Sequence, residues 1–176
     1  VTMAFMINNT AHAGDPVTLN ITGNVIASPC QVSSDSITKS VDLGQNIQAS
    51  SLQTAGAATN WVNFDINLNS CPAGTTKAIM TMHGTADLNN PGDMYRNTGT
   101  ATNLAVQVQS QAGDLLGNTK TISGTIASNA YTYKLRARAY TNKGGVMPGS
   151  ISAVVTPPFE YKSPYCAPAG GSATEI

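Results

Sequence analysis

Residues 17 to 25 are Val17-Thr18-Leu19-Asn20-Ile21-Thr22-Gly23-Asn24-Val25, and this stretch decides the fold class. Side chains alternate between the two faces of a β-strand, so the aliphatic residues share one face and the Thr and Asn residues share the other. Eight rises of roughly 3.3 Å make the stretch about 26 Å long, enough to run along a small β-sandwich. The pattern predicts a β-strand whose aliphatic face is buried in a sheet structure. An ordinary first strand is the alternative interpretation.

The composition favours an exported β-protein. With 176 residues, the chain is expected to form a single domain. Charged residues make up 10%, well below the usual quarter, and Thr, Ser, Asn, Gln and Gly fill the polar positions. Nine basic residues balance nine acidic ones, which argues against a partner such as nucleic acid or an anionic membrane surface.

The first residues resemble the end of an export signal. Met3-Ala4-Phe5-Met6-Ile7 is an apolar run too short to span a bilayer, and Ala11-His12-Ala13 has the small-x-small form of a signal-peptidase site. We therefore expect residues 1–13 to be a residual signal peptide, with Gly14 as the first mature residue. A disordered N-terminal tail is the alternative.

Three cysteines, Cys30, Cys71 and Cys166, are present without a Cys-x-x-Cys pair, and only two histidines accompany them. A zinc site is therefore not expected, nor is any other metal or cofactor. In an exported protein the natural disulfide joins Cys30 to Cys71, closing a loop worth roughly 4 kcal/mol in the chain-entropy model. Cys166 then remains as a free or intermolecular thiol in a tail rich in Pro, Gly and Ala.

Alternating apolar residues predict further short strands, separated by turns. They fall at residues 37–43, 62–68, 78–83, 104–108, 131–139 and 151–155. Between the first two, residues 45–60 either hold one helical turn or cross between sheets. The 131–139 strand is expected to carry Lys134, Arg136 and Arg138 on a solvated outer face. Strands at this spacing, with one linking disulfide, favour an antiparallel sandwich of immunoglobulin type.

Several segments, in order and spacing, resemble the pilin subunits of chaperone-usher fimbriae. They are residues 21–30, Val41-Asp42-Leu43-Gly44, Asn69-Ser70-Cys71-Pro72 and Phe159-Glu160-Tyr161. Within that family the chain is most similar to the tip-fibrillum adaptors of type 1 pili, through residues 55–58, Trp61, residues 84–87 and residues 99–103. If the subunit ends at Lys162, Tyr161 is its penultimate residue and Gly149 its fourteenth from the end, as in these pilins.

The resemblance implies an all-β fold, an incomplete immunoglobulin-like sandwich of six strands that lacks the seventh. It divides the chain into a donor-strand extension (14–27), a pilin domain (28–162) and a disordered C-terminal tail (163–176). The extension would enter a neighbour's groove through Val17, Leu19, Ile21 and Val25, with Gly23 where backbones approach closely. The acceptor-groove edge would consist of Gly149, Ile151, Ala153, Val155, Phe159 and Tyr161.

The same resemblance implies the partners and the route of assembly. A periplasmic chaperone would first lend a strand, and an outer-membrane usher and neighbouring pilus subunits would follow, so the chain would pass through the periplasm into an extracellular fimbrium.

Two features depart from the family. Pro157 and Pro158 lie in the last strand, where each removes a main-chain donor, and the tail after Lys162 is additional.

An enzymatic function is not expected. After signal removal only His83 remains as a histidine, and the carboxylates are scattered without pairing. Trp61, Phe64, Tyr131 and Tyr133 could stack on a carbohydrate, but core packing is the favoured interpretation. Two other functions stay open: a carbohydrate-binding adhesin module, and a secreted immunoglobulin-like domain that completes itself.

Overall fold

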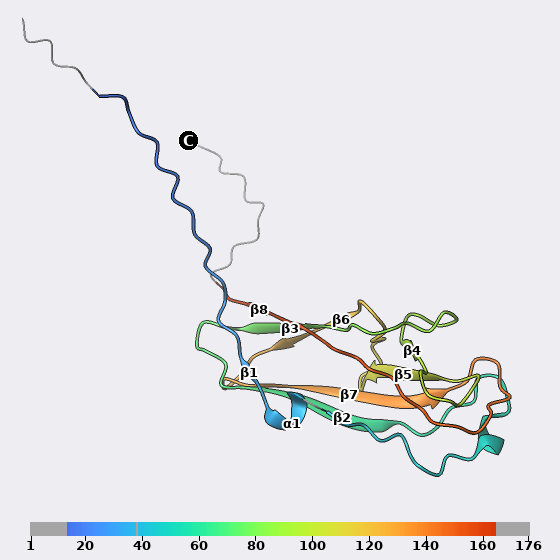
Figure 1. Cartoon of the computed structure of the whole chain (residues 1–176). Coiled ribbons are helices and arrows are strands. Elements are labelled where there is room, and N and C mark those ends of the chain that lie inside the picture. The colour runs from blue at the N-terminus through green and yellow to red at the C-terminus, as the bar shows by residue number, and fades with distance from the viewer. Residues whose placement is uncertain (1–13, 38, 165–176) are drawn as a thin grey trace, which may run out of the picture.

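The computed structural model describes residues 14–37 and 39–164, and their strands form two packed antiparallel sheets (Figure 1). The first sheet has the strand order β1-β2-β7-β5-β4 and the second β6-β3-β8. The strands of the first sheet are β1 (Gln31–Val32), β2 (Val62–Asn69), β4 (Met94–Arg96), β5 (Ala105–Ser110) and β7 (Tyr131–Tyr140). Those of the second are β3 (Lys77–Thr81), β6 (Thr121–Thr125) and β8 (Phe159–Lys162).

The long central pair β2 and β7 forms because both strands alternate apolar and polar residues. Phe64 lies opposite Leu135 and Ile66 opposite Tyr133, so their apolar side chains fall on one face of the sheet. That face packs on Ala78 and Met80 of β3, with the other core side chains between the sheets. The predicted strands at 62–68, 104–108 and 131–139 correspond to β2, β5 and β7.

Buried polar groups in this core have partners. The Tyr133 hydroxyl donates to the Ala78 carbonyl at 2.8 Å and the Tyr95 hydroxyl to the Leu116 carbonyl at 2.8 Å. Burial raises the pKa of both phenols, so each stays a neutral donor at physiological pH. The Cys30–Cys71 disulfide, confirmed here, links the residue before β1 to the residues after β2.

Three of the predicted strands are absent from the ladders. Residues 17–25 belong to no sheet, residues 151–155 contribute only an isolated bridge between Val155 and Gly84, and the strand expected over 37–43 is wrong. The chain instead makes one helical turn, α1 (Ser34–Ile37), in which the Ile37 N–H donates to the Ser33 carbonyl at 3.0 Å. The other local helix is the 3-10 turn η1 (Ala49–Leu52), within the segment where one helical turn was an expected option.

The residues that follow α1 keep the side-chain alternation of a strand. Lys39, Val41 and Leu43 are half-buried while Ser40 and Asp42 are exposed, although no described strand pairs with them. The apolar pattern was therefore interpreted correctly as extended backbone that faces the core. What is missing is a neighbour to complete the ladder, because a strand is defined by its hydrogen bonds.

Several features expected near the two ends of the chain fall outside the described residues. Residues 1–13 and Cys166, which carry the expected signal remnant and the unpaired thiol, lie outside the described residues, as does most of the expected tail. Across residues 14–37 and 39–164, no helix has the length and apolarity to cross a membrane. The same residues hold no group of three His, Cys, Asp or Glu side chains that could bind a metal ion.

Candidate strand-binding groove

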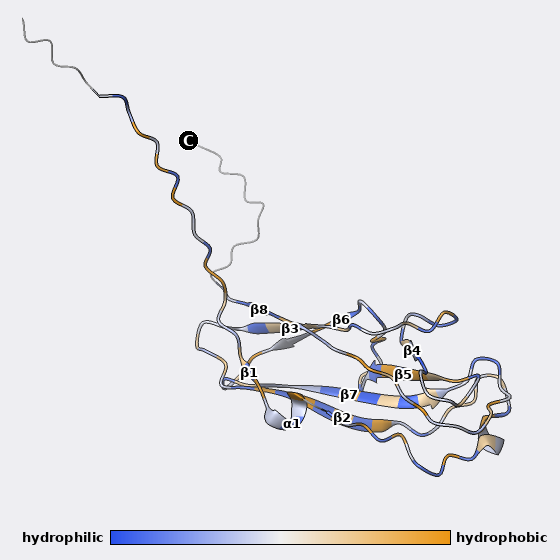
Figure 2. Ribbon diagram, in the orientation of Figure 1, coloured by the Kyte–Doolittle hydropathy of each residue, from blue (hydrophilic) through white to orange (hydrophobic). Residues whose placement is uncertain are grey.

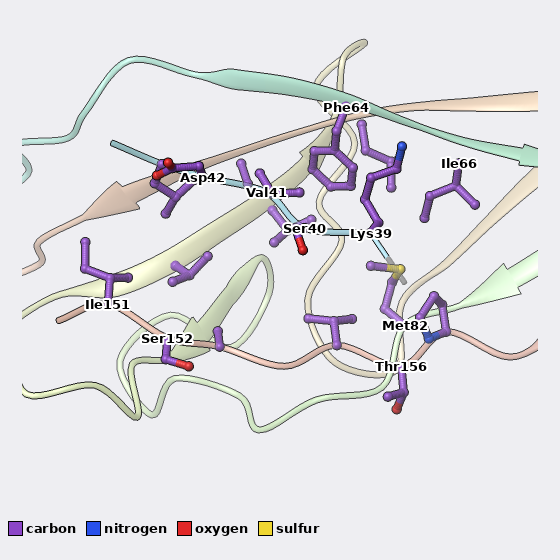
Figure 3. Close-up of a pocket in the computed structure, with 18 of the residues that line it drawn as sticks. Lys39, Ser40, Val41, Asp42, Phe64, Ile66, Met82, Ile151, Ser152 and Thr156 are labelled. Atoms are coloured by element: carbon purple, nitrogen blue, oxygen red, sulfur yellow. The ribbon is translucent and has the colours of Figure 1, made fainter. Parts of the chain in front are cut away.

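A groove of about 1340 Å³ runs between two extended segments, residues 39–47 and residues 149–159 (Figure 3). Its floor is the inner face of the five-stranded sheet. The floor side chains are Phe64 and Ile66 of β2, Val106 and Val108 of β5, and Leu135 and Ala137 of β7. The groove is therefore an opening into the hydrophobic core itself, with apolar side chains along its length.

Residues 150–158 form one rim, attached to the body through alternate residues. The Ser150 and Ser152 carbonyls accept from the Ala101 and Thr98 N–H groups at 3.0 and 2.8 Å. Further along, the Thr156 N–H donates to the His83 carbonyl at 2.8 Å, and the Pro158 carbonyl accepts from the Thr81 N–H at 3.0 Å. All of these groups point away from the groove.

The intervening residues of this rim face the other way. Successive main-chain groups of a strand point to opposite edges, so those of Ile151, Ala153 and Val155 point along the groove side. Within the described part of the chain these groups make no hydrogen bond. Their side chains are half-buried on the core, in strict alternation with exposed neighbours. The rim thus has the hydrogen-bonding potential of a sheet edge above an apolar floor.

The opposite rim is supplied by the segment after α1. Val41 and Leu43 pack on the core, and the stem of Lys39 lines the groove while its ammonium group lies 3.4 Å from an Asp35 carboxylate oxygen. At the exposed shoulder of this rim, the Gly44 N–H and then the Gln45 amide donate to Asp42 and lower the pKa of its carboxyl group. The Asp42 carboxylate therefore stays ionised at the rim.

Gly149 allows the first rim to approach the body closely. A Cβ at this position would lie 2.3 Å from the Ala101 nitrogen and 2.6 Å from the Thr100 carbonyl carbon, which is too close for any side chain. The residue is needed for this close contact and not for an unusual φ angle. It places the Ser150 carbonyl within reach of the Ala101 N–H, where the rim begins.

The two prolines of the rim remove donors from different edges. The main-chain groups of Pro158 point toward the body, as those of Thr156 do, and the Pro158 carbonyl accepts a hydrogen bond from the Thr81 N–H. The main-chain groups of Pro157 point to the groove side, as those of Val155 do. Proline has no N–H, so this position lacks a donor that would have pointed to the groove side. The Pro157 ring lines the groove and is half-buried. The groove rim therefore has one donor fewer than an ordinary strand edge.

The extension lies outside this groove. Figure 1 shows it leaving the body at the end where β8 also ends, and Figure 2 shows hydrophobic and hydrophilic residues alternating along it. Val17, Leu19, Ile21 and Val25 are between 77% and 96% exposed. A Cβ placed on Gly23 would have no atom of another segment within 4 Å. Four large aliphatic side chains in water are unfavourable for a segment that has no partner.

Most of the residues proposed from the sequence as a groove edge lie together here. Gly149, Ile151, Ala153, Val155 and Phe159 line the groove. Tyr161 lies outside the lining, packed on the core beside Phe159 in β8, and burial raises the pKa of its hydroxyl. The second rim, with Lys39 and Val41, was missed as a groove element, although the alternation up to Leu43 signalled extended chain.

Comparison with known proteins decides the family. The family model described as fimbrial protein matches residues 19–162. The chain belongs to this family. FimG of Escherichia coli strain K12 is 37% identical over 154 residues, which cover 86% of this chain and 88% of FimG. The S-fimbrial adhesin protein SfaS of Escherichia coli O6:K15:H31 is 36% identical over 89% of this chain and 93% of SfaS.

Solved fimbrial proteins have the same fold. The P pilus rod subunit PapA aligns with a TM-score of 0.62 and 24% identity over 77% of this chain and all of PapA. A chain in the structure of a chaperone-usher pilus aligns with a TM-score of 0.64 and 23% identity, over 90% of this chain and all of that one. The chain is therefore a pilin subunit of chaperone-usher pili, a surface-fibre protein and not an enzyme.

Proposed function

We propose that this pilin polymerises by donor-strand exchange, in which the extension of one subunit fills the groove of the next. The observation that carries the proposal is the apolar groove whose rim from Ile151 to Val155 has unused main-chain groups, beside an exposed alternating extension on the same chain. The fold is then an incomplete immunoglobulin-like sandwich, and an inserted strand supplies what it lacks.

The two parts match in length and period. Ile151 to Phe159 and Val17 to Val25 each span eight residue rises, about 26 Å of extended chain. The rim has a core-facing residue at every second position, and the extension has an aliphatic residue or Gly23 at the same period. Burying four aliphatic side chains contributes on the order of 6 to 12 kcal/mol before ordering costs, and main-chain hydrogen bonds add to this. The extension thus has enough apolar surface to hold two subunits together.

Each subunit both donates a strand and accepts one, which makes the assembly linear. The extension leaves one end of the body and cannot lie in its own groove as described, so each subunit donates to one neighbour and accepts from another. Such head-to-tail contacts produce a fibre and not a closed pair. Before assembly, a periplasmic chaperone would cover the open groove with its own strand, and an outer-membrane usher would then exchange it for a subunit.

Within the fibre we assign the chain to a minor adaptor position near the tip, where it would serve adhesion. This is supported by the identity to FimG, 37%, which exceeds the 32% to a type-1 fimbrial protein A chain of Escherichia coli. Gold-labelled antibody against this chain is expected to mark pilus ends in electron micrographs. Labelling along the whole shaft would show a repeating rod subunit instead and would overturn the assignment.

Replacing Pro157 by alanine is expected to strengthen the binding of an inserted strand. The change restores one donor on the groove side of the rim, and one more main-chain hydrogen bond of about 0.5 to 1.5 kcal/mol corresponds to an affinity about 2-fold to 12-fold higher. Titration of a fluorescent donor peptide into the full chain measures this. Pro158→Ala is the matched control, because its new N–H points to the body, and equal gains from both variants would contradict the orientation of the rim.

A further inference from the structure

The outer face of the five-stranded sheet carries a cluster of one indole and two guanidinium groups. The guanidinium carbons of Arg136 and Arg138 lie 4.2 and 4.1 Å from the centroid of the Trp61 ring. All three side chains are half-buried. The arginines lie on the outer face of the strand, as expected, but they are half-buried against Trp61 and not fully solvated. The expectation of a core role for Trp61 is wrong, because its flat ring lies on this outer face, where guanidinium groups stack on it.

Two glutamines of β5 hold the arginines in place. Arg136 donates to the Gln109 side-chain oxygen at 2.8 Å, and Arg138 donates to the Gln107 side-chain oxygen at 2.6 Å. The amide nitrogens of both glutamines donate in turn to one carboxylate oxygen of Asp93, at 2.6 and 2.8 Å. Asp93 and Gln107 are buried. This buried layer fixes the glutamine amides, and through them it fixes the guanidinium groups.

The arrangement leaves two positive charges with neutral acceptors. The nearby carboxylate of Asp93 is bonded to the amides and not to the guanidinium groups, and the Lys134 ammonium, further along β7, faces Asp65 at 3.9 Å. The Arg136 Nε atom is buried and has no hydrogen-bond partner within the described residues. Desolvation first, and then the Arg136 charge, lower the pKa of Arg138, although Tyr140 and Asp93 partly oppose this shift. Like charges held together in this way favour an anion between them.

A hollow of about 350 Å³ lies further along β7, and the cluster residues Trp61, Arg136 and Arg138 are not part of its lining. Tyr140, which lines it, follows Arg138 at the next position on the same face of β7, roughly 7 Å along the strand. Its other walls carry polar side chains suited to hydroxyl groups, among them Arg96, Asn90, Asn142 and Lys143. A ligand with a carboxylate on one side and several hydroxyl groups on the other would span the cluster and the hollow.

We propose that the outer face of the β2-β7-β5 sheet binds a carboxylate-bearing saccharide, with its carboxylate on Arg136 and Arg138 and its sugar ring over Trp61 and the hollow. The site lies on the opposite face of the sheet from the groove, so it stays open when an inserted strand fills the groove. A planar carboxylate accepts two hydrogen bonds at once from guanidinium donors, which a neutral sugar cannot do. Binding here does not depend on the proposed polymerisation.

Trp61 is the chain's one tryptophan, so its fluorescence tests the site directly. The full chain is titrated with a panel of uronic and nonulosonic acids, with their methyl esters, and with acetate. We expect a saturable change in emission with at least one sugar acid, no saturation with its ester, and weaker binding of acetate. Higher salt is expected to weaken the binding, because it screens the charges.

Arg138→Gln and Arg136→Gln are each expected to weaken binding by about tenfold or more, because a charge-assisted pair is lost. Lys77→Gln, on the exposed face of β3 in the other sheet, is the matched control and should bind like the unmodified chain. Arg136→Lys keeps the charge, and the melting temperature of each variant verifies the fold. The proposal is overturned by any of three results: no saturable response across the panel, equal binding of acid and ester, or a response that follows self-association of the chain.

Discussion

Replacing Ile21 by aspartate is expected to abolish polymerisation while leaving the subunit folded. The Ile21 side chain is 88% exposed in the single chain, so the substitution removes no contact from the folded body. In a neighbour's groove the same position would meet an apolar floor that includes Phe64, Val108 and Leu135. A carboxylate buried there without a partner costs several kcal/mol, and about 3 kcal/mol already lowers an association constant roughly a hundredfold.

Fibre length in electron micrographs and the elution of the chain on size-exclusion chromatography measure this effect. Asn20→Asp is the matched control, because it adds the same charge one residue away on the exposed polar face of the extension. We expect Asn20→Asp to polymerise and Ile21→Asp to remain in short species with an unchanged circular dichroism spectrum. Normal fibres from Ile21→Asp, or an equal defect in both variants, would show that the extension does not enter a groove through its aliphatic face.

The strands with strong alternation could be predicted from the sequence, and the weak ones could not. β2 and β7 alternate over their full length, so their position was evident. β4 has three residues, and β6 contains Gly124, which breaks an apolar pattern. That glycine is required because a Cβ there would lie 2.1 Å from the Tyr131 ring. The glycine is needed for a contact between two strands, and the local sequence pattern gives no sign of that contact.

The two rims of the groove show a different limit. Ile151, Ala153 and Val155 were expected in a strand, and Val41 and Leu43 were expected in another. Both segments are extended with the expected faces inward, yet the sheets that would contain them are incomplete in the single chain. A sequence pattern reports which side chains are to be buried. It does not report whether the strand that completes the ladder belongs to the same molecule.

The arginine cluster was missed for a physical reason of the same kind. Arg136 and Arg138 alternate with alanines on β7, which predicts an outer face, and that part is confirmed because Ala137 and Ala139 are buried while the arginines are not. The cluster also needs Trp61, which precedes β2 and contacts both arginines, and Asp93, which precedes β4 and holds the glutamines. Four separate segments thus make one surface, and their convergence follows from the strand order alone.

Adding the missing strand as a separate peptide is expected to raise the melting temperature of the chain markedly. The full chain carrying Ile21→Asp is the suitable acceptor, because its own extension no longer competes for the groove. A synthetic peptide of residues 14–27 is then added at about a hundred times its dissociation constant, which stabilises the folded state by about 2.7 kcal/mol. For a domain of this size, that corresponds to a rise of roughly 5 to 10 °C in calorimetry.

The same peptide with Ile21→Asp is the matched control and should produce little change. Because the peptide supplies a strand without supplying a second subunit, a rise in melting temperature separates completion of the sandwich from growth of a fibre. An unchanged melting temperature, together with a cooperative transition of the monomer, would mean that the groove is not an incomplete part of the fold. The rim from Ile151 to Val155 would then be an exposed sheet edge that this chain tolerates, and the alternation of residues 17–25 would need another partner.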